Sequence, residues 1–152
     1  DRNDYVKILK MYSLENYLLH PDNIKNLEEI EIDKFKMFLI QKINEKLGKL
    51  KEKIKSGVEK IRREKRQEIE LEIESNYEFL KLDEIKEERL LEIYAYIPMK
   101  ELLGEIVNWY NKNYRKDKEQ YSSDKFLTEL AQIFASNRDG DLYSNLKNII
   151  LS

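Results

Sequence analysis

Apolar residues recur in steps of three and four between Ile40 and Ile54, and this spacing limits the fold more than any other feature of the sequence. The pattern is a heptad seam, which continues to Val58 and Ile61 after a shift of one residue. Lysine and glutamate fill most of the remaining positions, as they do on the solvated face of a helix. The seam is formed by Ile40, Ile43, Leu47, Leu50 and Ile54.

A helical arm over residues 33–76 is predicted from this spacing, with Asp33 as its N-cap. A helix of about 40 residues, rising about 1.5 Å per residue, would be about 60 Å long. An antiparallel helical hairpin that breaks near Gly57 is the structural alternative. Residues 68–74 alternate glutamate with isoleucine or leucine, which is typical of a strand. Because glutamate and leucine favour a helix, we predict that the helix continues to about Asn76.

Composition places the chain in the mainly α class. Charged residues make up 38% of the sequence, and the chain contains only 4 glycines and 2 prolines, which favours exposed helices over sandwiches and barrels. We expect a small helical body, the long helix or helical hairpin as an arm, and at most two short strands, over Val6–Leu9 and near Leu91–Ala95.

Composition also excludes several kinds of site. The sequence has no cysteine, which rules out disulfides and zinc–thiolate sites and predicts a cytoplasmic protein. A net charge of −2 gives no overall attraction to nucleic acid or to a membrane surface. No apolar run approaches the roughly 20 residues of a membrane span, so we expect no membrane partner. His20 is the sole histidine, and its position at the end of a helix explains it without zinc.

Residues 77–152 are predicted to form a C-terminal helical region. Pro98 is suited to the first position of a helix that ends near Asn113, because proline lacks the N–H that would be unpaired there. Residues 122–124 are good capping residues for a second helix, Lys125–Ser136. Its apolar face consists of Phe126, Leu127, Leu130, Ile133 and Phe134.

The stretch from Tyr12 to Asp22 is the one place where residue order points beyond helix formation. Ser13 is placed as the N-cap of a short helix, whose apolar residues are Leu14, Tyr17 and Leu18 and which Pro21 terminates. If the expected strand Val6–Leu9 precedes it, Ser13 and Glu15 follow the end of a strand, where open α/β sheets place their ligand sites.

This stretch, Ser-Leu-Glu-Asn-Tyr-Leu-Leu over residues 13–19 followed by a proline-containing turn, resembles a segment of a known family. It is similar to the segment that closes the Toprim region of the OLD-like (overcoming lysogenization defect) AAA/ABC-type ATPase/nuclease proteins. Residues 97–103 and 126–131 also resemble helices of that family, although Met99 stands where glycine is usual. The resemblance implies that residues 1–32 end a Toprim-like segment and that the chain is the C-terminal part of a larger protein.

The resemblance further implies a metal-dependent nuclease. Ser13 and Glu15 would contribute to a Mg²⁺ or Mn²⁺ site, with Glu15 as the catalytic carboxylate and the remaining carboxylates upstream in the parent protein. The sequence has no phosphate loop of the form Gly-x-x-x-x-Gly-Lys-Ser/Thr, so ATP would bind only through a separate upstream ATPase/Toprim domain, and this chain alone should be inactive. The alternative is that Ser13 and Glu15 are ordinary helix-capping residues.

A basic run along the predicted arm, together with a lysine near Pro98, could contact DNA phosphates. The alternative is a solvated helix face with pairs such as Glu59 and Arg63. The candidate nucleic-acid-binding residues are Lys49, Lys53, Lys60, Arg62, Arg63, Arg66 and Lys100.

A second function, from a different class, is a non-catalytic helical interaction module. In that interpretation the apolar seam from Ile40 to Ile54 forms a homodimer, and Trp109 is a core or interface anchor.

Overall fold

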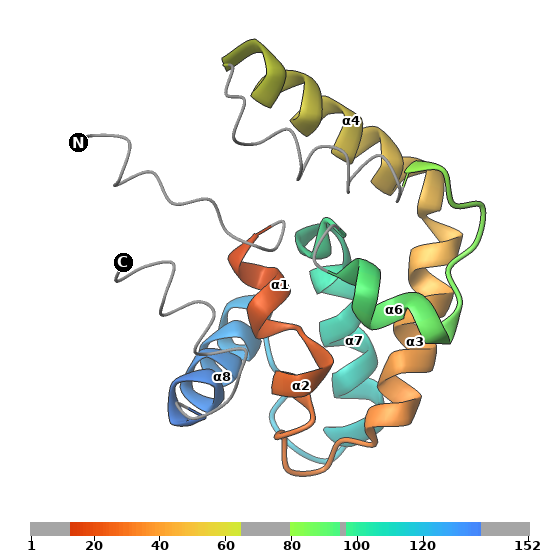
Figure 1. Ribbon diagram of the computed structural model, residues 1–152. Helices are drawn as coiled ribbons and strands as arrows, with labels where there is room; N and C mark the ends of the chain where they lie inside the picture. Colours follow the sequence, from red (N-terminus) through yellow and green to blue (C-terminus); the bar gives the residue numbers. More distant parts are fainter. Residues whose placement is uncertain (1–12, 65–79, 95–96, 138–152) are drawn as a thin grey trace.

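The computed structural model describes residues 13–64, 80–94 and 97–137 of the 152-residue chain, with side chains only as far as residue 56 in the first range. Throughout these ranges the chain forms helices and loops and contains no strand, which confirms the mainly α prediction (Figure 1). The elements are α1 (Leu14–Leu18), α2 (Pro21–Ile24), α3 (Ile32–Glu45), α4 (Leu47–Glu64), α6 (Glu87–Ile93), the 3₁₀ helix η4 (Met99–Leu102), α7 (Leu103–Tyr114) and α8 (Ser123–Ser136).

The strand expected near Leu91–Ala95 is wrong, because Leu91 to Ile93 belong to α6. Leu90 and Ile93 are buried while Leu91 is exposed, so this segment shows the one-sided burial of a helix at the surface. The other expected strand, Val6–Leu9, and the ambiguous segment 68–74 lie outside the described residues.

The helix predicted to begin at Asp33 is divided into α3 and α4. Its N-cap is Glu31 instead of Asp33, and the break comes at Lys46, where φ is −109° and ψ is 15°. Ordinary residues adopt this backbone conformation, so no glycine or proline is needed to mark the turn. The alternative break near Gly57 is also wrong, since α4 runs through that residue.

The apolar seam lies in the chain's own core. Ile43, Leu47, Leu50 and Ile54 are all buried, as are Phe35 and Leu39 on the preceding turns of α3. Burying each such side chain contributes roughly 1.5–3 kcal/mol, which explains why α3 and α4 keep one apolar stripe on either side of the bend. The predicted homodimer seam is therefore corrected for Ile43, Leu47, Leu50 and Ile54, which the chain's own core already covers, whereas Ile40 is half-buried.

The remaining helices surround α7. Helix α8 packs against α1, α2 and α7, and η4 packs between α1 and the start of α7 (Figure 1). The prediction for α8 is confirmed closely: Ser122 accepts a hydrogen bond from the backbone N–H of Lys125, and Phe126, Leu130 and Phe134 are buried. The helix predicted to begin at Pro98 instead begins with η4 and continues as α7.

Asparagine side chains join segments that lie far apart in the sequence. The Asn44 amide accepts from the backbone N–H of Ile85 at 2.7 Å and donates to its carbonyl at 3.0 Å, so it pairs with the chain as a strand would. Asn111 makes the same two contacts with Tyr121, both at 2.9 Å. Backbone N–H and C=O groups in a loop have no partners within the loop itself. Here the asparagine side chains supply those partners, so the loops before α6 and α8 can pack against the helices.

Candidate functional site

The candidate metal residues lie at the first turn of α1. Ser13 occupies the N-cap position, but its hydroxyl donates to the Asn16 side-chain oxygen at 2.8 Å instead of accepting a backbone N–H. The Asn16 amide in turn donates to the carbonyl oxygens of Tyr94, at 2.9 Å, and Ile97, at 2.7 Å. Ser13 therefore helps to orient a buried structural asparagine. The Glu15 side chain is half-buried.

The described residues do not by themselves fit a divalent metal. Mg²⁺ takes about six oxygen ligands, usually with one or two carboxylates among them. Among the side chains that the structure describes (residues 13–56, 80–94 and 97–137), no three acidic or histidine side chains gather around one point. Glu15 would thus need partners from elsewhere, as the family resemblance implies.

The candidate nucleic-acid residues are spread over α4 and η4. Lys49 and Lys100 are exposed, whereas Lys53 lies 3.5 Å from the Glu101 carboxylate. A neighbouring pair, Lys46 with Glu105, also joins the start of α4 to α7. These two ion pairs favour a structural role for part of the basic run. The side chains of Lys60, Arg62 and Arg63, and all of Arg66, lie outside the described part of the chain.

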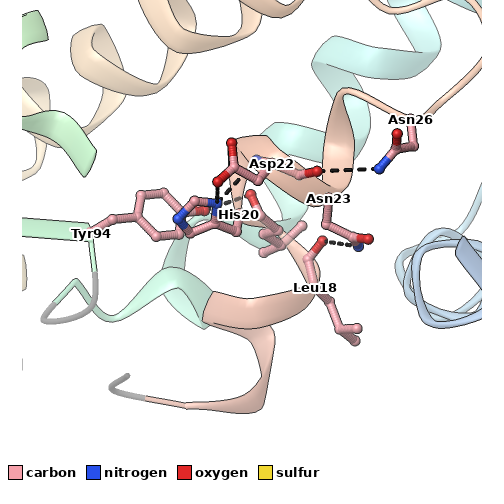
Figure 2. Close-up of polar contacts among 7 residues, drawn as sticks. Leu18, His20, Asp22, Asn23, Asn26 and Tyr94 are labelled. Atoms are coloured by element: carbon pink, nitrogen blue, oxygen red, sulfur yellow. Dashed lines mark hydrogen bonds and ion pairs between the residues drawn. The ribbon is translucent and has the colours of Figure 1, made fainter. Parts of the chain in front are cut away.

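His20 is a buried cap residue (Figure 2). Its Nδ1 accepts the backbone N–H of Asp22 at 3.0 Å, which makes His20 the N-cap of α2, and its ring meets the Tyr94 ring edge-on at 5.0 Å. Burial lowers the pKa of the His20 imidazole, while the nearby Asp22 carboxylate opposes this effect. A neutral ring that accepts at Nδ1 suits a structural role. The sequence placed His20 at the end of a helix, whereas the structure places it at the start of α2.

An open groove lies between α3, the segment before α6 and α7. Its volume is about 820 Å³, and its apolar lining comes from Met37, Phe38 and Ile40 on one side and Trp109 on the other. Met37 is 66% exposed, although it occupies a helix that is otherwise well packed. An exposed methionine beside aromatic rings is typical of surfaces that bind other proteins, because its flexible thioether side chain adapts to different shapes.

Aromatic packing holds the floor of the groove in place. Phe38 stacks on Trp109 with 5.1 Å between ring centroids, and Phe35 and Tyr114 contact the same indole at 5.8 and 5.6 Å. The Lys42 ammonium lies 5.8 Å from the centre of the Phe38 ring. Since Trp109 is held on several sides by other rings, the groove is formed before any partner binds.

Charge is unevenly distributed around the groove. Glu84, Glu87 and Glu88 are exposed on the α6 side, and none of them forms an ion pair with another residue in the described ranges. On the α3 side, Lys34 is paired with Glu31 at 2.9 Å, and this hydrogen bond raises the pKa of Lys34. The α6 side therefore carries unpaired negative charge.

Comparisons with protein families, with curated proteins and with solved structures find no match to this chain. The similarity to OLD-like proteins therefore stays a prediction from residues 13–19, 97–103 and 126–131. Among the helices that the structure describes, none has the length and apolar character to cross a membrane.

The sequence singled out Trp109 as an anchor but missed the groove as a whole. The helical pattern could not say whether Phe38 or Leu39 is buried; the structure buries Leu39 and leaves Phe38 half-buried at the groove. Met37 was the one signal in the sequence that could have indicated the groove. It is an apolar residue that does not fall on the buried stripe of α3, so an exposed apolar position was to be expected there.

Proposed function

We propose that this part of the chain is a non-catalytic helical interaction module, whose binding surface is the groove formed by Met37, Phe38, Ile40 and Trp109. The observation that carries the proposal is the high exposure of Met37 beside the fixed Phe38–Trp109 stack. Isolated apolar residues at a surface are common, but an exposed methionine continuous with an aromatic groove supports a contact with another protein.

The lining of the groove favours a helical ligand. The groove is open, and its apolar residues come from two helices, α3 and α7, as in the grooves that accept the apolar face of an amphipathic helix. This arrangement differs from the expected dimer seam, because it uses the half-buried Phe38 and Ile40 and the exposed Met37 at the edge of the core, not the fully buried stripe of α3. The function thus belongs to the interaction class predicted from the sequence. It shares Ile40 with the predicted seam and adds Met37, Phe38 and Trp109.

Trp109 makes the proposal directly testable, since it is the only tryptophan in the chain. The probe is an amphipathic peptide with leucine at positions i, i+3, i+4 and i+7 and glutamine elsewhere. Adding it should shift the Trp109 emission to shorter wavelength in a saturable way, because the indole loses water contact. Met37→Ser should weaken this binding, whereas Leu91→Ser, which removes an exposed apolar residue outside the groove, should not. Equal weakening by both variants, or no saturable shift, would contradict the proposal.

The metal-dependent nuclease function implied by the family resemblance is a second proposal. What supports it in the structure is the half-buried Glu15 at the start of α1 and the exposed Lys49 and Lys100. Since no three acidic or histidine side chains gather among the described residues, the proposal requires the upstream part of a parent protein to provide further ligands, and no step is assigned to the metal.

This second proposal is tested with Mn²⁺ and DNA in a protein that includes the native upstream sequence. Loss of Mn²⁺ binding, followed by electron paramagnetic resonance, is expected in Glu15→Gln but not in Glu28→Gln, an exposed carboxylate elsewhere. If DNA contacts Lys49, Lys49→Ala should lower the slope of log binding constant against log salt by about one. Unchanged Mn²⁺ affinity in Glu15→Gln would contradict the metal site and leave Ser13 with its structural contact to Asn16.

A further inference from the structure

We infer that the partner of the groove is a basic amphipathic helix, with apolar side chains that contact Met37 and Trp109 and lysine or arginine residues that face Glu84, Glu87 and Glu88. This inference rests on the interaction function proposed above and adds to it the chemistry of the partner.

Charge complementarity is the first argument. Glu84, Glu87 and Glu88 line one side of the groove and have no ion partner among the described residues, although the chain pairs its acids elsewhere, as in Glu29 with Lys118 and Glu92 with Arg89. Among the described residues that line that side, Lys86 is the only cation, and it is exposed. A partner with several basic residues would reduce the repulsion among these carboxylates and would be drawn toward them before contact.

The position of the carboxylates is the second argument. Glu87 and Glu88 lie in the first turn of α6, where the helix dipole favours acidic residues. Stabilisation of α6 therefore accounts for these two glutamates without any partner. Glu84 precedes the helix and gains nothing from its first turn, yet it lines the same groove. The acidic side therefore extends beyond what α6 requires for its own stability.

The opposite side of the groove explains why the basic residues of the partner must point toward α6. Lys34 already shares its charge with Glu31, and Gln41 is uncharged, so α3 offers apolar surface and little free charge. A helix in the groove would thus place its apolar face on α3 and α7 and one flank on the acidic side. Such a ligand has a single favoured orientation about its own axis.

The test uses three amphipathic peptides with the same leucine face and with lysine, glutamine or glutamate on the flank, each titrated against Trp109 emission. At low salt the lysine peptide should bind about tenfold more tightly than the glutamine peptide, and the glutamate peptide should bind most weakly. The preference should shrink as salt rises, because exposed charge pairs are screened. Changing Glu84, Glu87 and Glu88 together to glutamine should remove the preference.

A matched control is the triple change Glu28→Gln, Glu52→Gln and Asp117→Asn, which alters the net charge equally at exposed positions outside the groove. If this control removes the preference as fully, the effect is one of net charge and the inference is wrong. If all three peptides bind equally and Met37→Ser weakens each of them, the interaction function stands and the basic partner does not. If no peptide binds, both are overturned.

A second copy of the chain is the competing occupant. Sedimentation of the full chain over a range of concentrations distinguishes it, since a basic helix as partner predicts a monomer in the absence of peptide. A dimer that dissociates in Met37→Ser and persists in Leu91→Ser would show that the groove binds another copy, and would overturn the inference.

Discussion

The Tyr94 hydroxyl donates a 2.6 Å hydrogen bond to the backbone carbonyl of Leu19, a residue 75 positions earlier in the sequence. Both residues are fully buried, and burial raises the pKa of the Tyr94 hydroxyl well above its ordinary value, so it remains a donor at any physiological pH. This bond ties the end of α6 to the turn between α1 and α2. It shows that the α1–α2 segment is part of the core.

Tyr94→Phe should lower the free energy of unfolding by about 1–3 kcal/mol, because the Leu19 carbonyl then stays buried without a donor. Urea denaturation followed by circular dichroism measures this change. Tyr121→Phe is the control, since the Tyr121 ring is half-buried and its hydroxyl makes no hydrogen bond within the described residues; it should cost less than about 0.5 kcal/mol. Similar losses in both variants would contradict the importance of the Tyr94–Leu19 bond.

Asn16→Asp should destabilise the protein by about 2–3 kcal/mol or more at pH 7. The buried amide donates to two carbonyl oxygens, and a carboxylate of the same shape would face them without a proton to donate. The pKa of the new carboxyl should be raised in the folded state, so the deficit relative to wild type should shrink as pH falls toward 4 and grow as pH rises. Asn26→Asp, at an exposed position, should show neither effect.

Glycine at position 104 offers a stabilising change. Gly104 is exposed in the first turn of α7, and a Cβ added there would meet no atom within 4 Å. Gly104→Ala should therefore raise the free energy of unfolding by about 0.4–1 kcal/mol, mainly by restricting the unfolded chain. Gly48→Ala in α4 should act in the same direction, for the same reason. A lower midpoint of thermal unfolding in both variants would show that these turns need the freedom of glycine.

Helix-forming stretches were predictable from the sequence where local signals agreed. In α8, a serine cap, an apolar face and the Asn137 end occur together, and the predicted and observed helices differ by two residues at the start. The break at Lys46 was not predictable, since the apolar spacing continues from Ile43 to Leu47 without interruption and the bend uses a conformation open to any residue. The spacing of apolar residues shows which side chains face the core. Two successive helices that pack on the same core can keep the same spacing, so the spacing does not reveal the break between them.

The contacts that build the candidate site could not be predicted from the sequence, because they join residues far apart in the chain. Asn44 reads as a polar residue on a helix, and only the folded chain shows that it pairs with Ile85 and fixes the segment that carries Glu84. The groove likewise brings together Met37 and Trp109, which come from helices far apart in the sequence and line the same groove. A single sequence shows which face of each helix is apolar. It does not show which other helix or loop packs against that face.

His20 should make the stability of the protein depend on pH between about 5 and 7. Burial lowers the pKa of the folded imidazole below 6.5, so the unfolded state binds more protons than the folded state in this range. Stability should therefore be complete above pH 6.5 and decrease as pH falls toward the folded pKa, with a slope of up to about 1.4 kcal/mol per pH unit. Protonation also removes the acceptor that Nδ1 offers to the Asp22 N–H.

Because His20 is the only histidine, its ring signals in a proton NMR titration are unambiguous, and their midpoint is expected below 6.5. His20→Asn supplies the matched variant, since asparagine can still cap α2 but does not titrate. Its unfolding free energy should vary less with pH between 5 and 7 than that of the wild type. A midpoint above 6.5 would mean that attraction to the Asp22 carboxylate outweighs burial, and the stability of the wild type would then increase instead as pH falls through this range.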